Sequence, residues 1–231
     1  KTQLTKKVIE NAPKLLAVGA FCIGTKQIDL ETCKENGIVV FNAPYSNTRS
    51  VVELAIGEII MLMRSVFQRS TEIHSGAWNK TAQGSREVRG KKLGIVGYGN
   101  IGKQLAKLCD VLSINYFFCD PFIEKTDAQG DYRSINEVVK ADIISLHVPI
   151  TKEGEHPTYH LFDAARLTQL KPDAILINSC RGDVVDNEAL VKHMNNTPEF
   201  TAVIDVWQNE PTINHQLLNL VNIATPHIAG Y

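Results

Sequence analysis

The stretch that decides the fold reads Leu93-Gly94-Ile95-Val96-Gly97-Tyr98-Gly99-Asn100-Ile101-Gly102, an apolar run that leads directly into a GxGxxG pattern. A helical stretch, a second apolar run at 114–118 and Asp120 follow it. In a dinucleotide-binding βαβ unit, the first glycine permits a tight turn and the second lets backbone N–H groups approach a pyrophosphate. The third glycine lets the helix pack against the strand. The pattern therefore predicts such a unit.

Asp120 indicates which dinucleotide is preferred. A carboxylate about 20 residues past the glycine loop accepts hydrogen bonds from the adenosine ribose hydroxyls and repels a 2′-phosphate. A GxGxxG pattern alone is a weak signal and is more often an ordinary glycine-rich turn than a cofactor loop. The strand before it, the helix after it and Asp120 together favour a cofactor loop, and they predict NAD rather than NADP.

The composition, 44% apolar and 21% charged residues in a chain of 231, is that of a soluble globular protein with one or two domains. A formal net charge of −1 gives no broad attraction for nucleic acid or an anionic membrane. We therefore expect a small-molecule partner held by local groups.

The five cysteines are odd in number and form no CxxC pair, which argues against a disulfide framework or a zinc site. They are Cys22, Cys33, Cys109, Cys119 and Cys180. We expect reduced thiols and a cytoplasmic protein. The first residues carry no apolar signal segment, and the most apolar window, 54–63, is too short to span a membrane.

The first part of the chain already has an α/β pattern. Residues 14–19 predict a buried strand, 29–36 a short helix and 38–41 a second strand. Ser50 and Glu53 have capping-box spacing ahead of a helix predicted at 51–64. Apolar residues cover nearly the whole circumference of that helix, so we expect it to be buried at a domain or subunit interface.

Strand and helix signals continue to alternate after the glycine loop. They fall at 142–148, 163–170, 174–179, 187–195 and 201–206. Such alternation, with continuous apolar runs in the strands, is typical of a doubly wound parallel sheet. The predicted fold class is therefore α/β, with a Rossmann-type NAD domain.

Three polar residues fall where predicted strands end, at Arg181, Glu210 and His227. Ligands of such sheets bind beyond the carboxyl ends of the strands. An arginine offers a planar fork for a carboxylate, a histidine can take a hydroxyl proton, and a carboxylate can orient the imidazole. Each residue alone is as typical of an ordinary surface, but the set matches the oxidation of a 2-hydroxy acid.

Three motifs resemble the signatures of the D-isomer-specific 2-hydroxyacid dehydrogenase family. They are INSCRGDVVD at 177–186, DVWQNEP at 205–211 and TPHIAG at 225–230. The resemblance implies that Arg181 binds the substrate carboxylate and the carbonyl oxygen, that His227 is the general acid/base, and that Glu210 tunes His227. It also places Asp205 near the nicotinamide carboxamide and the 179–181 backbone beside the cofactor.

Together with the glycine loop, the resemblance implies a set of cofactor-binding residues. The set is Gly97, Gly99, Asn100, Ile101, Gly102, Asp120, His147, Val148, Ser179, Cys180, Arg181, Asp205, His227 and Gly230.

The resemblance within the family is divided. Up to about residue 105 the chain is similar to bacterial D-3-phosphoglycerate dehydrogenases, through VGAFCIGT at 18–25 and FNAPYSNTRS at 41–50. From about residue 119 it is more similar to erythronate-4-phosphate dehydrogenases, through GDYRS at 130–134 and PITKEG at 149–154. A chimeric or divergent chain would explain the division. Both groups oxidise a phosphorylated D-2-hydroxy acid, with 3-phosphoglycerate favoured here and 4-phosphoerythronate as the alternative.

The division extends to the expected substrate site. Asn47 and the backbone near Ala20 and Cys22 match contacts of the phosphoglycerate enzymes, whereas Tyr231 matches a tyrosine of the erythronate enzymes. With Arg181, these residues form the predicted substrate-binding set. A noncatalytic NAD-sensing interaction protein of the same fold is a further alternative, which the complete set of arginine, glutamate and histidine disfavours.

The resemblance implies domain limits of 1–46 for a partial, flavodoxin-like substrate-binding domain and 47–226 for the NAD-binding domain. Residues 227–231 would then begin the return to the substrate domain. On this basis we expect the chain to lack the opening segment that holds the substrate phosphate. Trp78 lies in a segment that resembles the dimer contact region of the family, so we expect a homodimer or a higher homo-oligomer.

We expect no metal site. His156 and His160 are four residues apart, but Pro157 lies between them and no acidic residue is placed as a zinc-protease base would be. A surface loop is the preferred interpretation of this segment.

Overall fold

The computed structural model describes residues 2–123 and 130–231. The chain divides into two compact units, Lys1–Arg49 and Ser50–Tyr231, and each is described here by itself. Lys1, where the expected substrate domain begins, lies outside the described residues. Within the part that is described, no helix is long and apolar enough to cross a membrane.

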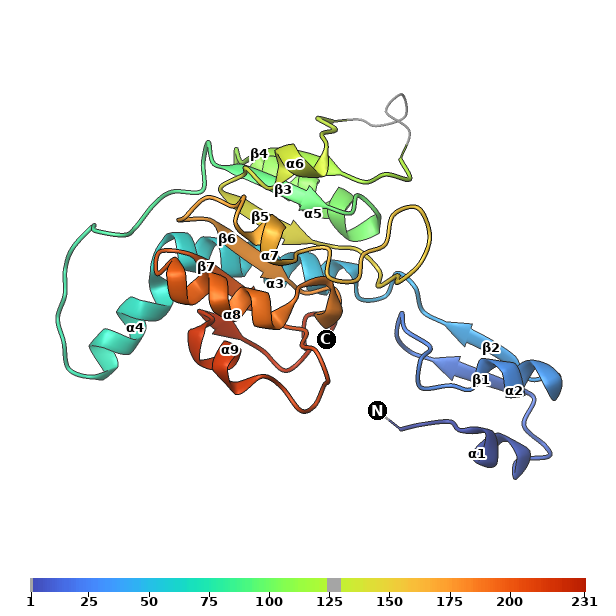
Figure 1. Cartoon of the computed structure of the whole chain (residues 1–231). Helices are drawn as coiled ribbons and strands as arrows, with labels where there is room; N and C mark the ends of the chain where they lie inside the picture. The colour runs from blue at the N-terminus through green and yellow to red at the C-terminus, as the bar shows by residue number, and fades with distance from the viewer. Residues whose placement is uncertain (1, 124–129) are drawn as a thin grey trace. The chain divides into compact units, whose positions relative to one another are not determined.

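The first unit contains two parallel strands and two short helices (Figure 1). Its elements are α1 (Lys6–Glu10), β1 (Ala17–Ala20), α2 (Leu30–Glu35) and β2 (Val39–Asn42). Helix α2 begins where the sequence predicts, because the Asp29 side chain accepts a hydrogen bond from the Thr32 backbone N–H. The strand prediction at 38–41 is also confirmed, one residue further along.

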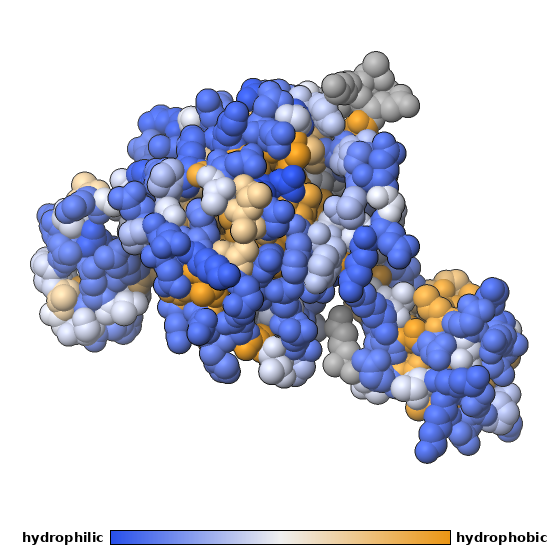
Figure 2. Space-filling view, viewed as in Figure 1, coloured by the Kyte–Doolittle hydropathy of each residue, from blue (hydrophilic) through white to orange (hydrophobic). Residues whose placement is uncertain are grey.

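A strand forms close to the predicted range 14–19, but the prediction that this strand is buried is wrong. Strand β1 exposes Ala17 and Gly19 and buries only Ala20. The reason is that this strand pairs with a single described neighbour, so its faces have little to pack against. Figure 2 accordingly shows hydrophobic patches on this unit, where Phe21 and Phe41 are exposed.

In the second unit, the described residues form a six-stranded sheet in which every pairing is parallel, in the order β4-β3-β5-β6-β7-β8 (Figure 1). The strands are β3 (Lys92–Val96), β4 (Asn115–Cys119), β5 (Ile143–Leu146), β6 (Ile175–Asn178), β7 (Thr201–Ile204) and β8 (Ile223–Ala224). The helices are α3 (Thr48–Met63), which crosses the boundary of the units, α4 (Val66–His74), α5 (Asn100–Val111), α6 (Ile135–Val138), α7 (Ala164–Leu167), α8 (Asn187–Asn196) and α9 (His215–Leu220). The predicted doubly wound α/β sheet is confirmed.

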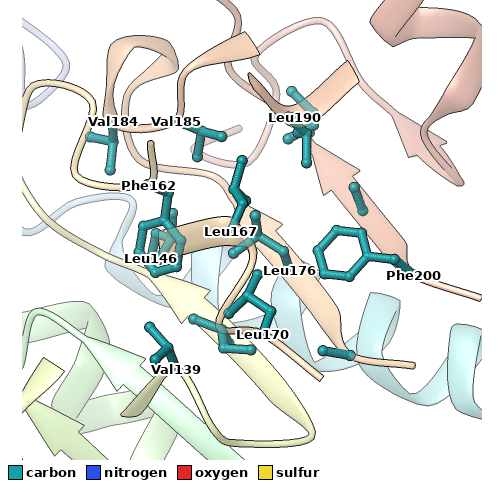
Figure 3. Close-up of a cluster of buried hydrophobic side chains, with 14 of the residues drawn as sticks. Val139, Leu146, Phe162, Leu167, Leu170, Leu176, Val184, Val185, Leu190 and Phe200 are labelled. Carbon is teal, nitrogen blue, oxygen red and sulfur yellow. The ribbon is translucent and has the colours of Figure 1, made fainter. Parts of the chain in front are cut away.

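Helices cover both faces of this sheet because the strands alternate their apolar side chains. Ile143 belongs to one buried cluster and Ile144 to the other, and the same alternation places Ile175 and Leu176 in different clusters. The cluster that holds Ile144 and Leu176 is drawn in Figure 3, where Leu146 and Phe162 lie close together. The continuous apolar runs in the sequence are thus explained by strands buried on both sides.

Helix α3 differs from its prediction at its start. It begins at Thr48, so Ser50 lies inside the first turn and the predicted capping box is wrong. The burial of the helix is as expected, since Val52, Ile59 and Met63 are members of one core cluster. Glu58 is buried on the same helix with an exposed fraction of 5%.

Candidate active site

The sheet order reverses between β3 and β5, and the loops after these two strands meet there. From β3 the chain continues to β4, which lies on one side of β3. It then crosses to β5 on the other side of β3, and the later strands follow in order out to β8. Ligands of open α/β sheets bind at such a point, outside the carboxyl ends of the strands. Gly97 follows β3 with φ of +93°, and a Cβ there would lie 2.4 Å from the His147 carbonyl oxygen, after β5. The two loops are therefore in backbone contact.

The three glycines of the loop are required for different reasons. A Cβ on Gly102 would lie 2.3 Å from the Gly97 carbonyl oxygen, so helix α5 packs directly on the turn. A Cβ on Gly99 would meet no described atom within 4 Å, although Gly99 forms the N-cap of α5. Close contacts within the protein thus explain why Gly97 and Gly102 cannot carry a side chain, but they do not explain the glycine at position 99. An anion that approaches the α5 N-terminus closely would account for it.

Asp120 follows β4 directly and holds the same loop. Its Oδ2 accepts a hydrogen bond from the Tyr98 backbone N–H at 2.9 Å, and its Oδ1 accepts one from the Phe122 N–H at 3.1 Å. The Tyr98 ring stacks on Phe118 with 3.6 Å between the ring centroids. The carboxylate is therefore fixed beside the glycine loop, where the sequence places it.

Two residues of the predicted cofactor set carry buried polar atoms that have no hydrogen-bond partner among the described residues. They are Ser179, through its Oγ, and His147, through its Nδ1. The other ring nitrogen of His147 lies 2.8 Å from the Ser145 hydroxyl. Burial lowers the pKa of His147 to about 4, so its ring is neutral at physiological pH. Unpartnered buried groups are costly, and a bound polar ligand would satisfy them.

The turn after β6 positions Arg181. Asn178, at the end of β6, accepts from the Cys180 backbone N–H at 3.2 Å and donates through its side chain to the Arg181 carbonyl oxygen at 3.0 Å. The Arg181 guanidinium donates to the Cys180 carbonyl oxygen at 2.6 Å. Burial raises the pKa of the Cys180 thiol to about 11, so it is a thiol and not a thiolate.

Asp205 anchors the segment that carries His227. It lies just beyond β7 with an exposed fraction of 1%, and it accepts hydrogen bonds from the Thr225 hydroxyl at 2.6 Å and the Ile228 N–H at 2.7 Å. The Ala229 N–H donates to its other oxygen at 3.0 Å. The His227 N–H donates to the Asp205 carbonyl oxygen at 2.8 Å. The predicted cofactor residue Gly230 follows at the end of this segment.

His227 and Glu210 form a direct pair. The Nδ1 of His227 lies 2.8 Å from Oε2 of Glu210, and Oε1 of Glu210 accepts from the Trp207 N–H at 2.8 Å. The Arg181 turn reaches the same segment, since a Cβ on Gly182 would lie 2.1 Å from the Trp207 carbonyl oxygen. The three predicted catalytic residues are therefore carried by segments that are in contact at the carboxyl edge of the sheet.

The remaining predicted residues divide between the units. Ala20, Cys22 and Asn47 lie in the first unit, whereas Arg181 and Tyr231 lie in the second. In the second unit, Asn100 and Ile101 form the first turn of α5, and Val148 follows His147 in the loop after β5.

The sequence analysis did not predict a network of polar side chains that adjoins the segment carrying Glu210. His160 lies in a loop, as expected, but its side chain is half-buried and its Nε2 lies 2.9 Å from the Gln208 side-chain nitrogen. Gln208 also donates to Asp183 at 3.0 Å. Glu58 lies in the most apolar window of the sequence, 54–63, and is buried although it carries a carboxyl group. His160 and Gln208 are 48 positions apart, which explains why no local pattern revealed their contact.

The parts of the chain that are described, 2–123 and 130–231, contain no group of three or more His, Cys, Asp or Glu side chains that could hold a metal ion.

Comparison with known proteins relates the whole chain to one family. The family model described as D-isomer specific 2-hydroxyacid dehydrogenase, NAD binding domain, matches residues 56–229. The chain is 49% identical to D-3-phosphoglycerate dehydrogenase of Haemophilus influenzae, with 100% of the chain and 57% of that relative covered. It is 41% identical to D-3-phosphoglycerate dehydrogenase 2 of Saccharomyces cerevisiae, with 100% of the chain and 52% of that relative covered. The chain thus spans about half the length of the curated relatives it matches.

Solved structures give the same result for the fold. The TT0316 protein from Thermus thermophilus matches with a TM-score of 0.86 and 30% identity, over 97% of this chain and 72% of its own. The NAD-dependent formate dehydrogenase from Staphylococcus aureus, in complex with NAD, matches with a TM-score of 0.81 and 28% identity, over 99% of this chain and 69% of its own.

Proposed function

The chain belongs to the D-isomer specific 2-hydroxyacid dehydrogenase family, and from that premise we propose that it oxidises a phosphorylated D-2-hydroxy acid to the 2-oxo acid. The observation that carries the proposal is the hydrogen-bonded pair of His227 and Glu210, at the same edge of the sheet as the Gly99 loop. A pair of this kind is suited to moving a proton, and a noncatalytic NAD sensor would not need it.

The residues present fit NAD. The open side of Gly99 at the α5 N-terminus suits the pyrophosphate, and Asp120 suits the adenosine ribose. The unpartnered Ser179 hydroxyl and the buried Asp205 carboxylate suit the nicotinamide end. When bound, NAD supplies the acceptor for the hydride that leaves the substrate carbon.

The chain's own residues perform the remaining tasks. The Arg181 guanidinium binds the substrate carboxylate with two parallel hydrogen bonds and orients the hydroxyl-bearing carbon. The Nδ1 of His227 faces the Glu210 carboxylate, which leaves its Nε2 to accept the hydroxyl proton. Glu210 stabilises the imidazolium that forms, and the Trp207 N–H holds Glu210 in place.

The substrate we propose is D-3-phosphoglycerate, supported by matches of this whole chain to 57% and 52% of the two D-3-phosphoglycerate dehydrogenases and by the resemblance that assigns Asn47 to the substrate site. The similarity of the later motifs and of Tyr231 to erythronate-4-phosphate dehydrogenases keeps 4-phospho-D-erythronate as the alternative substrate. We also propose a cytoplasmic homo-oligomer in which Trp78, 80% exposed, lies at a subunit contact.

The test is NADH formation with D-3-phosphoglycerate and with 4-phospho-D-erythronate, at equal protein concentration and saturating NAD. We expect turnover with D-3-phosphoglycerate. Turnover with the erythronate alone would assign the alternative substrate. NADH binding without turnover of either compound would contradict the proposed enzyme and favour the NAD-sensing protein.

A further inference from the structure

A polar network joins the Arg181 turn to the segment that carries Glu210. The side chain of Gln208 lies at its centre, two residues before Glu210. Its nitrogen donates to the Asp183 carboxylate at 3.0 Å, and its oxygen accepts from the Asn187 backbone N–H at 3.1 Å. Asp183 itself lies two residues after Arg181. One amide therefore holds together the two segments that present the catalytic groups.

The partners of Gln208 fix the orientation of its amide. A backbone N–H can only donate and a carboxylate can only accept, so the Gln208 oxygen must face Asn187 and the nitrogen must face Asp183. The same nitrogen lies 2.9 Å from Nε2 of His160. Because an amide nitrogen only donates, Nε2 of His160 must be an acceptor. His160 must therefore be neutral and carry its proton on Nδ1.

The surroundings of His160 are consistent with this tautomer. Its Nδ1 lies 3.6 Å from Oδ2 of Asp186, which can accept that proton. Tyr159 stacks on the imidazole with 4.0 Å between the ring centroids, and the Lys152 ammonium lies 5.0 Å from the centre of the Tyr159 ring. The charged or titratable groups that face His160 are thus the Asp183 and Asp186 carboxylates, Tyr159 and, beyond it, Lys152.

Backbone bonds attach the His160 segment to the same turn. The His160 N–H donates to the Asp183 carbonyl oxygen at 2.8 Å, and the Phe162 N–H donates to the Val184 carbonyl oxygen at 3.0 Å. Figure 3 shows Phe162 in the buried cluster near Val184 and Val185. His160 is therefore held rigidly against the Arg181 turn, and movement at the network would occur at the Gln208 side chain.

We propose that His160 and Gln208 are positioning residues whose hydrogen bond locks the Arg181 turn to the Glu210 segment, and that protonation of His160 opens this lock. A protonated His160 would place a second N–H against the amide nitrogen of Gln208, and two donors repel. Gln208 could then face His160 only with its oxygen, which would break the bonds to Asp183 and Asn187. The effect on turnover rests on the proposed function, whereas the tautomer of His160 does not.

The first experiment is the pH profile of kcat/KM between about pH 5 and 8, the range in which histidines titrate. We expect log kcat/KM of the unmodified protein to fall with a slope steeper than 1 toward acid pH, and to lose up to about tenfold more activity than the proposed base alone explains, because an opened lock also lowers the rate. The variant His160→Gln can place an amide oxygen where Nε2 of His160 lies, so it keeps the acceptor that faces Gln208, and it does not titrate. We expect it to retain activity at pH 8 and to show a slope near 1. Equal slopes in the two proteins would overturn the proposal.

Two further variants separate positioning from general structure. Gln208→Leu should lower kcat/KM at pH 8 by about tenfold, through kcat more than KM, as expected when an interaction that orients the reacting groups is lost. His156→Gln changes an exposed histidine nearby and should leave the steeper acid limb of the unmodified protein unchanged. A Gln208→Leu protein with unchanged kcat would contradict the positioning role.

The second experiment needs no turnover. Long-range ¹H–¹⁵N NMR at pH 8 reports which ring nitrogen of His160 carries the proton, and the His160→Gln spectrum identifies its signals. We expect a protonated Nδ1 and an unprotonated Nε2. A protonated Nε2 would refute the network even in an active enzyme. A protonated Nδ1 in a protein that oxidises neither substrate would show instead that the proposed function had failed.

Discussion

The Nδ1 of His227 and Oε2 of Glu210 lie 2.8 Å apart, and the second carboxylate oxygen is held by the Trp207 N–H. Both oxygens of Glu210 are therefore engaged, and the carboxylate has a fixed direction. A carboxylate in this position keeps the imidazole in the tautomer that has its proton on Nδ1. The free nitrogen, Nε2, then has one role in the proposed reaction, as the base that accepts the hydroxyl proton.

Replacement of His227 with Ala should lower kcat by about 10²–10⁴-fold, since a positioned general base contributes that much. Glu210→Gln keeps the size of the side chain but removes the charge, so we expect a smaller loss, about tenfold. Fluorescence titration should show that both variants still bind NADH. A fully active His227→Ala protein would refute the assignment of the base.

The glycine loop offers a test of the cofactor site that separates folding from binding. Gly99→Ala places a methyl group where no described atom lies within 4 Å, at a φ of −74° that alanine adopts without strain. We expect an unchanged melting temperature and a Kd for NADH raised about tenfold, or 1.4 kcal/mol. The added methyl would occupy the space into which the pyrophosphate must come.

Gly102→Ala is the matched control for that variant. Its methyl group would lie 2.3 Å from the Gly97 carbonyl oxygen, so the helix must shift and the protein should lose about 1–3 kcal/mol of stability. Normal NADH affinity in Gly99→Ala would mean that the cofactor does not approach the α5 N-terminus.

Asp120 should control both the order of the loop and the choice of cofactor. Asp120→Ala removes the acceptor of the Tyr98 N–H and the charge that repels a 2′-phosphate. We expect weaker binding of NADH and a smaller ratio between the Kd values of NADPH and NADH. Isothermal titration with both cofactors measures this ratio. An unchanged ratio with a weakened Kd for both would assign Asp120 to loop structure alone.

The sequence predicted the parts of the fold and site that depend on local pattern. The strand at 93–96, the glycines after it and the helix that follows form one continuous stretch, and the apolar runs reveal strands buried on both faces. The start of α3 was predicted too late because the capping-box spacing of Ser50 and Glu53 indicated a first turn there, whereas the helix begins at Thr48. The network of His160, Gln208 and Asp183 was missed because tertiary contacts between distant segments leave no periodic signal.

Glu58 is the clearest case of a property that only the folded chain reveals. Its two carboxylate oxygens are buried and have no hydrogen-bond partner among the described residues. Burial, and after it the charge of Asp205, raise the pKa of Glu58 from 4.5 to about 7. A single acidic residue in an otherwise apolar helix gives no sign of this in the sequence, because its pKa depends on which groups pack around its carboxyl group in the fold.

This raised pKa predicts how stability varies with pH. Between pH 4.5 and about 7 the folded protein keeps the Glu58 proton, whereas the unfolded chain releases it. The free energy of unfolding must therefore fall as pH rises through this range, by about 3 kcal/mol from this group, and become level above it. The variant Glu58→Gln has no ionisable group at this position. The difference in the free energy of unfolding between the unmodified protein and this variant should therefore change by about 3 kcal/mol between pH 5 and 8. Urea unfolding monitored by the fluorescence of the buried Trp207 measures it, with Glu199→Gln as the exposed control. Parallel stability curves for the unmodified protein and Glu58→Gln would show that Glu58 is not a neutral acid in the folded state.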